Sequence, residues 1–366
     1  MLDHWLAPVS TPYQPPTKED TLGAHCAIHR TDGFPDLSTV RVALVGVQPD
    51  AAGRIRQSFF PLQNAFPDLP LADLGNIRNN NQSFLIPVLK ELLESGIIPV
   101  LIGASVRDQI ASFLAFQEVI RETSLVVVDE RIQLSAQPDN LPEYYLNDIL
   151  YHPQQPPFHL GLIGYQLQYT ASALRSVLDQ RNIDHVRLGD ARNRMSELEP
   201  LIRDADLLGF HLSSLRAAEC SAVAHPTPSG FHTEEACRIC RYAGMSDKLK
   251  SFGIYGYAPL QDTNGLSAQV VAQMLWYFLE GIAHRKRDFP ASTAGLTEYI
   301  VQLKQLDYPL TFWKSEKSGR WWLQIPVKTR RAQERHRLIP CSYQDYQQAS
   351  HDELPDRLWR ALRRFP

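Results

Sequence analysis

Short apolar runs alternate with helical patterns over about 250 residues of this chain, and this alternation limits its possible folds more than any other feature. The runs at 40–50 (VRVALVGVQPD), 97–105 (IIPVLIGAS) and 124–132 (SLVVVDERI) are typical of strands buried on both faces. Between them, residues 83–96 (SFLIPVLKELLESG) carry apolar side chains at helical spacing. This order predicts parallel βαβ units and a sheet covered by helices on both faces.

Composition divides the chain into three parts. Residues 1–38 contain the Pro-rich stretch PVSTPYQPPT and predict an extended arm on the surface. Residues 39–290 hold the alternating pattern and predict one α/β domain. Residues 291–366 carry short β-like runs and an amphipathic helix, and within them 301–366 has 13 Lys and Arg against 7 Asp and Glu. We expect this part to form a basic C-terminal appendix packed on or beside the core.

Charge and hydropathy argue against several classes of protein. The net charge of −3 argues against a dedicated nucleic-acid binder, which would usually be clearly basic. No apolar run approaches the roughly 20 residues of a membrane span, and the first residues lack the features of a signal peptide. The odd count of five cysteines favours a reducing compartment, so we expect a cytoplasmic protein without membrane insertion.

Polar residues directly after the buried runs are the first candidates for a functional site. Ligands of parallel α/β sheets bind beyond the carboxyl ends of the strands. The segments at these positions are 48–50, 103–108, 129–131, 210–213 and 255–259.

Four of the surrounding segments resemble the ureohydrolase family of arginase, agmatinase and formimidoylglutamase in order and spacing. Residues 99–113 (PVLIGASVRDQIASF) resemble the family's GGDHS segment, and 124–134 (SLVVVDERIQL) resemble its DAHxD segment. Residues 205–244 resemble the SxDxDxxDP segment with its following helix, and 251–279 resemble the segment with a late glutamate. The resemblance covers residues 40–287 and implies a three-layer α/β/α arginase-like fold, here with a small C-terminal β/α appendix.

The resemblance also implies a two-manganese site, but this chain departs from the family pattern at most of the corresponding positions. The family's metal ligands and late glutamate fall on Val106, Asp129, Arg131, Gln133, His211, Ser213 and Gly256. Two divalent ions need several oxygen and imidazole ligands, and among these ligand positions only Asp129 keeps the family's residue. Arg131 and Arg216 would bring positive charge toward the place of two cations. We therefore expect no metal cofactor and no catalytic residues.

Two functions remain open at this stage. The first is a pseudoenzyme that keeps the fold and binds a protein partner or a small anionic ligand, or a scaffold that binds through its arm and appendix. The alternative is an active, manganese-dependent hydrolase of linear amidine C–N bonds in formimidoylglutamate, agmatine or arginine. That activity requires other carboxylates to supply ligands, and the candidates are Asp50, Asp108, Glu130 and Asp262.

Individual site residues have competing interpretations. Asp129 could pair with Arg131 or Arg107, or could hold a single metal ion with His211. Arg107, Arg131 and Arg216 could form an anion pocket, since guanidinium groups suit carboxylates and phosphates, or ordinary ion pairs.

The C-x-x-C pair has two interpretations of its own. Cys237 and Cys240 could indicate redox or zinc chemistry, but their position inside a predicted helix favours buried cysteines.

The appendix offers the candidate partner contacts. Residues 328–337 (KTRRAQERHR) could touch an acidic partner, although a solvated loop is the simpler interpretation. Trp321 and Trp322 lie on a β-like run and should point to opposite faces. We expect one to pack on the core, while the other could contact a partner or the N-terminal arm. A protein partner is expected, and a homo-oligomer is possible.

Overall fold

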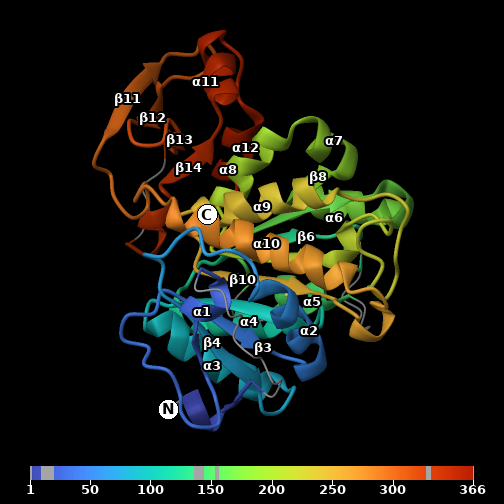
Figure 1. The fold of residues 1–366 in the computed structure, drawn as a ribbon. Helices are drawn as coiled ribbons and strands as arrows, with labels where there is room; N and C mark the ends of the chain where they lie inside the picture. The colour runs from blue at the N-terminus through green and yellow to red at the C-terminus, as the bar shows by residue number, and fades with distance from the viewer. Residues whose placement is uncertain (1, 10–19, 136–143, 153–155, 327–330, 366) are drawn as a thin grey trace.

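The computed structural model describes residues 2–9, 20–135, 144–152, 156–326 and 331–365, and it has two sheets (Figure 1). The larger, ten-stranded sheet runs in the order β1-β4-β3-β5-β10-β9-β6-β7-β8, and β2 also pairs with β4. Every pairing in it is parallel except that of β1 with β4. The strands are β1 Leu6–Ala7, β2 Ala27–Ile28, β3 Val42–Gly46, β4 Leu71–Ile77, β5 Ile98–Ala104, β6 Ser124–Val128, β7 His159–Tyr165, β8 Asp184–Arg187, β9 Leu207–His211 and β10 Ser251–Tyr255.

Helices cover both faces of this sheet, as the alternating pattern predicts. In β3, Val42 and Leu44 point into one apolar cluster, whereas Ala43 and Val45 point into another. The first cluster is closed by α2, α8, α9 and α10, and the opposite face is covered by α3, α4, α5 and α6. The helices of the core are α1 Leu22–His25, α2 Pro49–Phe59, α3 Gln82–Glu94, α4 Asp108–Val119, α5 Tyr145–Leu150, α6 Ser172–Gln180, α7 Leu188–Asn193, α8 Leu198–Arg203, α9 Thr233–Met245 and α10 Leu266–Ala283. The predicted three-layer α/β/α class is confirmed. Within the described residues, no helix is long and apolar enough to cross a membrane.

The N-terminal segment is integrated into the sheet edge, which differs from the extended surface arm that its composition predicts. Strands β1 and β2 both pair with β4, in registers that set Leu6 opposite Ile77 and Ala27 opposite Ala72. The side chain of Leu6 is fully buried. The apolar residues at this end therefore close the core, and most of the Pro-rich stretch falls within 10–19, outside the described residues.

The C-terminal module, residues 296–365, forms the second sheet. Its four antiparallel strands are β11 Leu296–Val301, β12 Leu310–Ser315, β13 Trp321–Gln324 and β14 Leu338–Cys341, followed by α11 Tyr343–Ser350 and α12 Asp356–Leu362. Figure 1 shows the module at one end of the molecule, above α8 and α9. The expected β/α appendix is therefore present, with its own small apolar core around Phe312 and Leu323.

Buried ion pairs hold this module against the amino ends of the core strands. Asp204 lies just before β9, and its carboxylate accepts hydrogen bonds from Lys248 of the core at 2.7 Å and from Arg364 of the module at 2.5 Å. Arg364 also reaches Asp184 at the start of β8, at 2.8 Å. Arg335 forms a two-fold contact with Asp206, which in turn accepts the backbone N–H of Ser124 in β6. Arg335 and Arg364 of the basic tail are thus used inside the molecule.

Two expectations for the appendix hold only in part. In the described part of 328–337, Glu334 and Arg337 are exposed as in a solvated loop, but His336 is fully buried, with its ring centre 4.2 Å from that of Phe158. Neither tryptophan is free for a partner, since Trp321 is 6% exposed and Trp322 is fully buried. The guanidinium carbon of Arg203 in α8 lies 4.3 Å from the ring centre of Trp322, which confirms that one tryptophan packs on the core.

These contacts predict a strong dependence of stability on Asp204. Although burial favours its neutral form, Lys248 and Arg364 hold the pKa of the Asp204 carboxyl well below its usual range. Asp204→Asn leaves both cations without their partner in a buried place, so we expect a loss of about 3 kcal/mol in the free energy of unfolding by urea denaturation. Asp352→Asn is the matched control, because Asp352 pairs with Lys304, whose side chain is 90% exposed, and it should change stability far less. Equal effects of the two substitutions would contradict this account.

Candidate functional site

The carboxyl ends of β5, β6, β9 and β10 bring the sequence candidates together at one edge of the sheet. His211 ends β9 and lies opposite Tyr255, the last residue of β10. Asp129 directly follows β6, which is the other neighbour of β9. Asp129 and His211 are 4% and 1% exposed, so this centre is closed to solvent.

His211 is held by partners on both sides of its ring. Its Nδ1 lies 3.4 Å from Oδ2 of Asp129, and its Nε2 lies 2.6 Å from Oε1 of Gln109. The hydroxyl of Tyr145 lies 3.1 Å from the same Nε2 and donates to Gln109 Oε1 at 3.1 Å. Burial lowers the pKa of His211 to about 4, so the ring is neutral at pH 7.

The carboxylate side of the cluster is also occupied. Ser213 donates its hydroxyl proton to Oδ1 of Asp129 at 2.9 Å. Burial raises the pKa of Asp129, and burial together with contact with Asp129 raises the pKa of Glu130 to about 8. Two buried carboxyls side by side cannot easily both be charged, so they hold a proton near neutral pH.

Gln109 and Tyr145 were both missed from the sequence. Gln109 lies within the 99–113 segment but matches none of the family's ligand positions, and Tyr145 lies in α5, outside the motif segments. The space for Gln109 depends on Gly209 of β9, because a Cβ at that position would lie 2.2 Å from the Gln109 amide nitrogen. A glycine within an apolar run is a weak signal of such a close approach. It does not say which side chain fills the space.

The remaining motif positions do not add ligands. Gly256 has φ +83°, and a Cβ there would face Val106 at 3.6 Å, so a methyl group of Val106 and bare backbone occupy these two positions. Gln133 is half-buried, and its carbonyl accepts the backbone N–H of Leu146 at 3.1 Å.

The three candidate arginines contact three different carboxylates. Arg107 pairs with Asp148 at 3.1 Å, and Arg131 pairs with Glu130 at 3.4 Å while its guanidinium lies 4.6 Å from the Tyr169 ring centre. Arg216 lies 3.5 Å from Glu219. These contacts favour the ion-pair interpretation over one shared anion pocket.

Of the carboxylates considered as replacement ligands, Asp108 and Asp262 have structural roles, whereas Glu130 lies beside Asp129 with one buried oxygen unpartnered among the described residues. Asp108 accepts hydrogen bonds from the backbone N–H and the hydroxyl of Ser105, at 2.7 and 2.8 Å. Asp262 accepts the Tyr257 hydroxyl at 2.8 Å and the backbone N–H of Ala268, at the start of α10, at 2.9 Å. Asp50 is exposed on α2.

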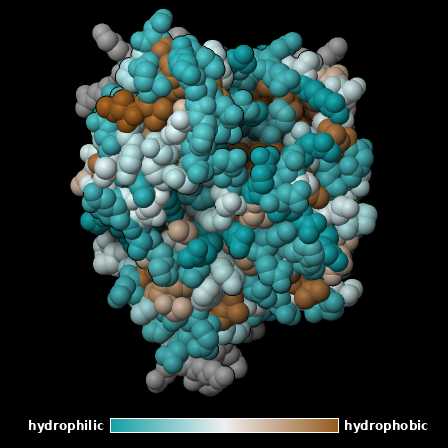
Figure 2. All heavy atoms as spheres, turned by 90° about the horizontal axis from the view of Figure 1, so that it is seen from above, coloured by the Kyte–Doolittle hydropathy of each residue, from teal (hydrophilic) through white to brown (hydrophobic). Residues whose placement is uncertain are grey.

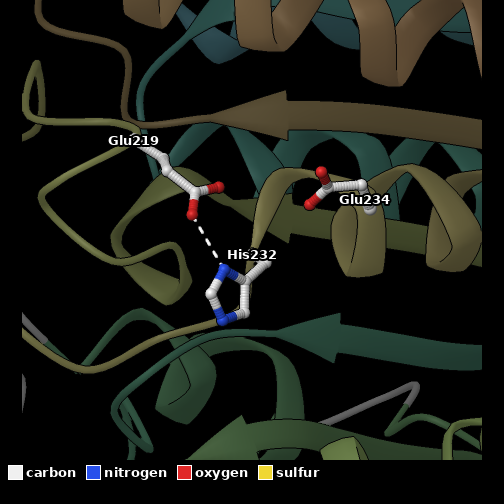
Figure 3. Close-up of side chains that lie close together, drawn as sticks. All are labelled: Glu219, His232 and Glu234. Carbon is white, nitrogen blue, oxygen red and sulfur yellow. Dashed lines mark hydrogen bonds and ion pairs between the residues drawn. The ribbon is translucent and has the colours of Figure 1, made fainter.

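One other group among the described residues has metal-ligand spacing. Potential ligand atoms of Glu219, His232 and Glu234 lie within 4.8 Å of one another, at the start of α9 (Figure 3). Figure 3 shows the Glu219 carboxylate facing the His232 ring, at 2.9 Å. Glu219 also accepts the backbone N–H of Thr233, and Arg216 lies 3.3 Å from the His232 ring nitrogens. A capped helix end and a neighbouring guanidinium explain this group better than a cation does.

The C-x-x-C pair is buried in α9, as the cysteine interpretation predicts. Cys237 and Cys240 are free thiols and almost fully buried. Burial raises the pKa of Cys237 to about 12, and burial also raises the pKa of Cys240. Thiols of this kind are poor nucleophiles and poor metal ligands.

Comparison with known proteins identifies the fold. No family model and no curated protein matches the sequence. The structure of Trypanosoma cruzi formiminoglutamase with Mn²⁺ aligns with a TM-score of 0.62 at 15% identity, over 73% of this chain and 99% of that one. Formimidoylglutamase from Bacillus subtilis aligns with a TM-score of 0.59 at 16% identity, over 72% and 96% of the two chains. Agmatine ureohydrolase of Thermoplasma volcanium aligns with a TM-score of 0.56 at 16% identity, over 69% of this chain and 92% of that one. The arginase-like fold implied by the motifs is therefore confirmed.

The buried carboxyl pair predicts a specific dependence of stability on pH. The pKa of Glu130, raised to about 8 in the folded protein from 4.5, means that the folded state holds this proton more tightly than the unfolded chain. Its contribution to stability is present below about pH 4.5 and is lost as the pH rises to about 8. Glu130→Gln removes this loss because glutamine does not titrate. The free energy of unfolding of the variant, relative to that of the parent, should therefore rise by on the order of 3 kcal/mol between pH 5 and pH 8.

Urea denaturation of both proteins at the two pH values measures this gain. The control is Glu118→Gln, because the Glu118 side chain is 50% exposed and pairs with Lys90 on the surface. If the difference in free energy of unfolding between Glu130→Gln and the parent is the same at pH 5 and pH 8, Glu130 is already ionised in the folded protein at pH 5.

Proposed function

We propose that this chain, which has the fold of the formiminoglutamase and agmatine ureohydrolase structures, is a divergent ureohydrolase relative that acts by binding and not by amidine hydrolysis. One observation carries the proposal. At the carboxyl ends of the central strands, His211, Asp129 and Gln109 contact one another in a closed, buried cluster. A hydrolase would need open space for water and substrate at this edge of the sheet.

The donor set supports the loss of metal chemistry. A pair of manganese ions needs several carboxylate and imidazole ligands with bridging oxygens. Within the described residues, Asp129 and His211 are the only such side chains in contact at this edge that also occupy ligand positions of the motifs. A serine, a valine, a glutamine and an arginine occupy others. These side chains do not fit a two-manganese centre.

The burial and the pKa of His211 also argue against hydrolysis without a metal ion. A general base must reach a water molecule next to the substrate and must accept its proton near neutral pH. His211 is 1% exposed, its pKa is lowered to about 4 by burial, and both ring nitrogens face protein atoms. Nδ1 of His211 and Oδ2 of Asp129 have no hydrogen-bond partner among the described residues, but burial keeps both atoms away from the water that a general base would have to reach.

Binding is the role that the remaining features favour. The apolar runs that form the fold are intact, so the chain retains a stable scaffold with the C-terminal module attached by buried ion pairs. A protein partner is our proposed ligand class, because two adjoining pockets lie between β8 and the helices α11 and α12, away from the former catalytic edge.

Metal content and activity test the proposal together. Protein purified from manganese-supplemented cells should contain far less than one manganese ion per chain, and added MnCl₂ should leave its melting temperature unchanged. It should release no product from formimidoylglutamate, agmatine or arginine under conditions in which a formiminoglutamase does. Tight binding of two manganese ions with turnover of any of these amidines would establish the alternative, an active hydrolase.

A further inference from the structure

A groove runs between the core and the C-terminal module, and we call it the β8 groove. It consists of two adjoining pockets of about 320 and 470 Å³, which share His185, Asp356 and Arg360. Its walls come from β8 and the helices around it on one side and from α11 and α12 on the other. Figure 2, a view of the end that carries the module, shows a hollow there with a largely hydrophilic rim.

The first pocket of the groove carries an excess of negative charge. Two of its carboxylates are used by the fold, since Asp184 pairs with Arg360 and Asp345 pairs with Arg357. Four other carboxylates of the pocket have no ion-pair partner within the described parts of the chain. Among the arginines that line the pocket, only Arg194 is likewise without an ion-pair partner in those parts. These four carboxylates belong to Asp190, Glu197, Glu353 and Asp356.

Apolar side chains lie beneath this acidic rim. Leu198 and Leu201 are buried, and Val186 and Leu354 are half-buried in the same pocket. A lysine or arginine side chain matches this arrangement, because its methylene stem covers apolar surface while its charged end stays among carboxylates at the rim. A compact inorganic cation would gain nothing from the apolar base.

The second pocket extends the groove along an open edge of the large sheet. In the described structure β8 pairs only with β7, so its outer side is a sheet edge. Trp359 of α12 is 53% exposed there, next to Leu178 and Ile183. Extended peptides commonly bind along sheet edges, and exposed tryptophans are frequent anchors of peptide contacts.

We propose that the β8 groove binds an extended segment of a protein partner that carries lysine or arginine next to aliphatic residues. The basic side chain lies over Leu198 and Leu201 with its charge among Glu197 and Glu353. The apolar neighbours of that side chain pack on Trp359. This inference names the partner for the binding role proposed above and rests on that role, but it does not depend on the metal content of the former catalytic edge.

Fluorescence anisotropy with a defined peptide tests the groove. The probe is fluorescein-labelled Gly-Leu-Lys-Val-Lys-Leu-Gly, and the same peptide with glutamate in place of lysine is the charge control. We expect saturable binding of the lysine peptide to the full chain and at least tenfold weaker binding of the glutamate peptide.

Two matched double variants place the binding site. Glu197→Gln with Glu353→Gln should weaken binding of the lysine peptide at least about fivefold. Asp32→Asn with Asp68→Asn makes the same change in net charge at exposed positions outside both pockets, and it should leave binding unchanged. Melting temperatures of both variants verify that they are folded.

Three outcomes would overturn the inference. Absence of saturable peptide binding excludes this partner class, and equal weakening by the two double variants shows non-specific attraction to net charge. Displacement of the peptide by 1,5-diaminopentane at the affinity of the peptide itself would assign the groove to a small organic cation. None of these results bears on manganese binding, so failure here is distinct from failure of the proposed loss of hydrolase activity.

Discussion

A parallel sheet buried on both faces directs most polar chemistry to its two ends, and much of this structure follows from that constraint. The buried ion pair of Arg56 in α2 with Asp73 in β4 is an exception. Helices cover both faces of the large sheet, so the side chains of β3, β5, β6, β9 and β10 are apolar along their length. Charged and hydrogen-bonding groups accumulate where the strands begin and where they end. Each end then needs its own means of satisfying buried polar atoms, because unpaired groups there would cost stability.

The two ends solve this problem in different ways. At the amino ends, Asp204 and Asp206 are matched by Arg364 and Arg335 of the C-terminal module, so the module neutralises buried charge of the core. At the carboxyl ends, uncharged groups contact His211 and Asp129: Gln109 binds Nε2 of His211, and Ser213 donates to Oδ1 of Asp129. The first solution attaches an additional domain to the fold. The second fills the edge at which proteins of this architecture bind ligands.

Much of the fold could be predicted from the sequence, because period and apolar runs are local properties. The strands at 42–46, 98–104 and 124–128 fall within the predicted runs, and the motif spacing placed Asp129 and His211 at one edge of the sheet. The contacts of His211 could not be predicted, because Gln109 is no ligand position of its motif segment and Tyr145 reaches His211 from a helix outside the motif segments.

The buried contacts of the basic tail could not be predicted from the sequence. Its charges look solvated in sequence, since pairing partners such as Asp206 and Arg335 lie more than a hundred residues apart. The tryptophans at 321 and 322 misled in the same way, because their burial depends on the docking of the module on α8. Long-range ion pairs leave no periodic pattern, so the sequence indicated an appendix packed on or beside the core but not the buried ion pairs that attach it.

The central claim is that protein side chains, not metal ions, fill the carboxyl ends of the central strands. Anomalous diffraction at the manganese absorption edge, from crystals grown with excess MnCl₂, tests it most directly. The account predicts no anomalous peak between Asp129 and His211 and a direct contact of His211 Nε2 with Gln109. A pair of strong peaks at this edge, with His211 turned away from Gln109 to ligate one of them, would contradict it.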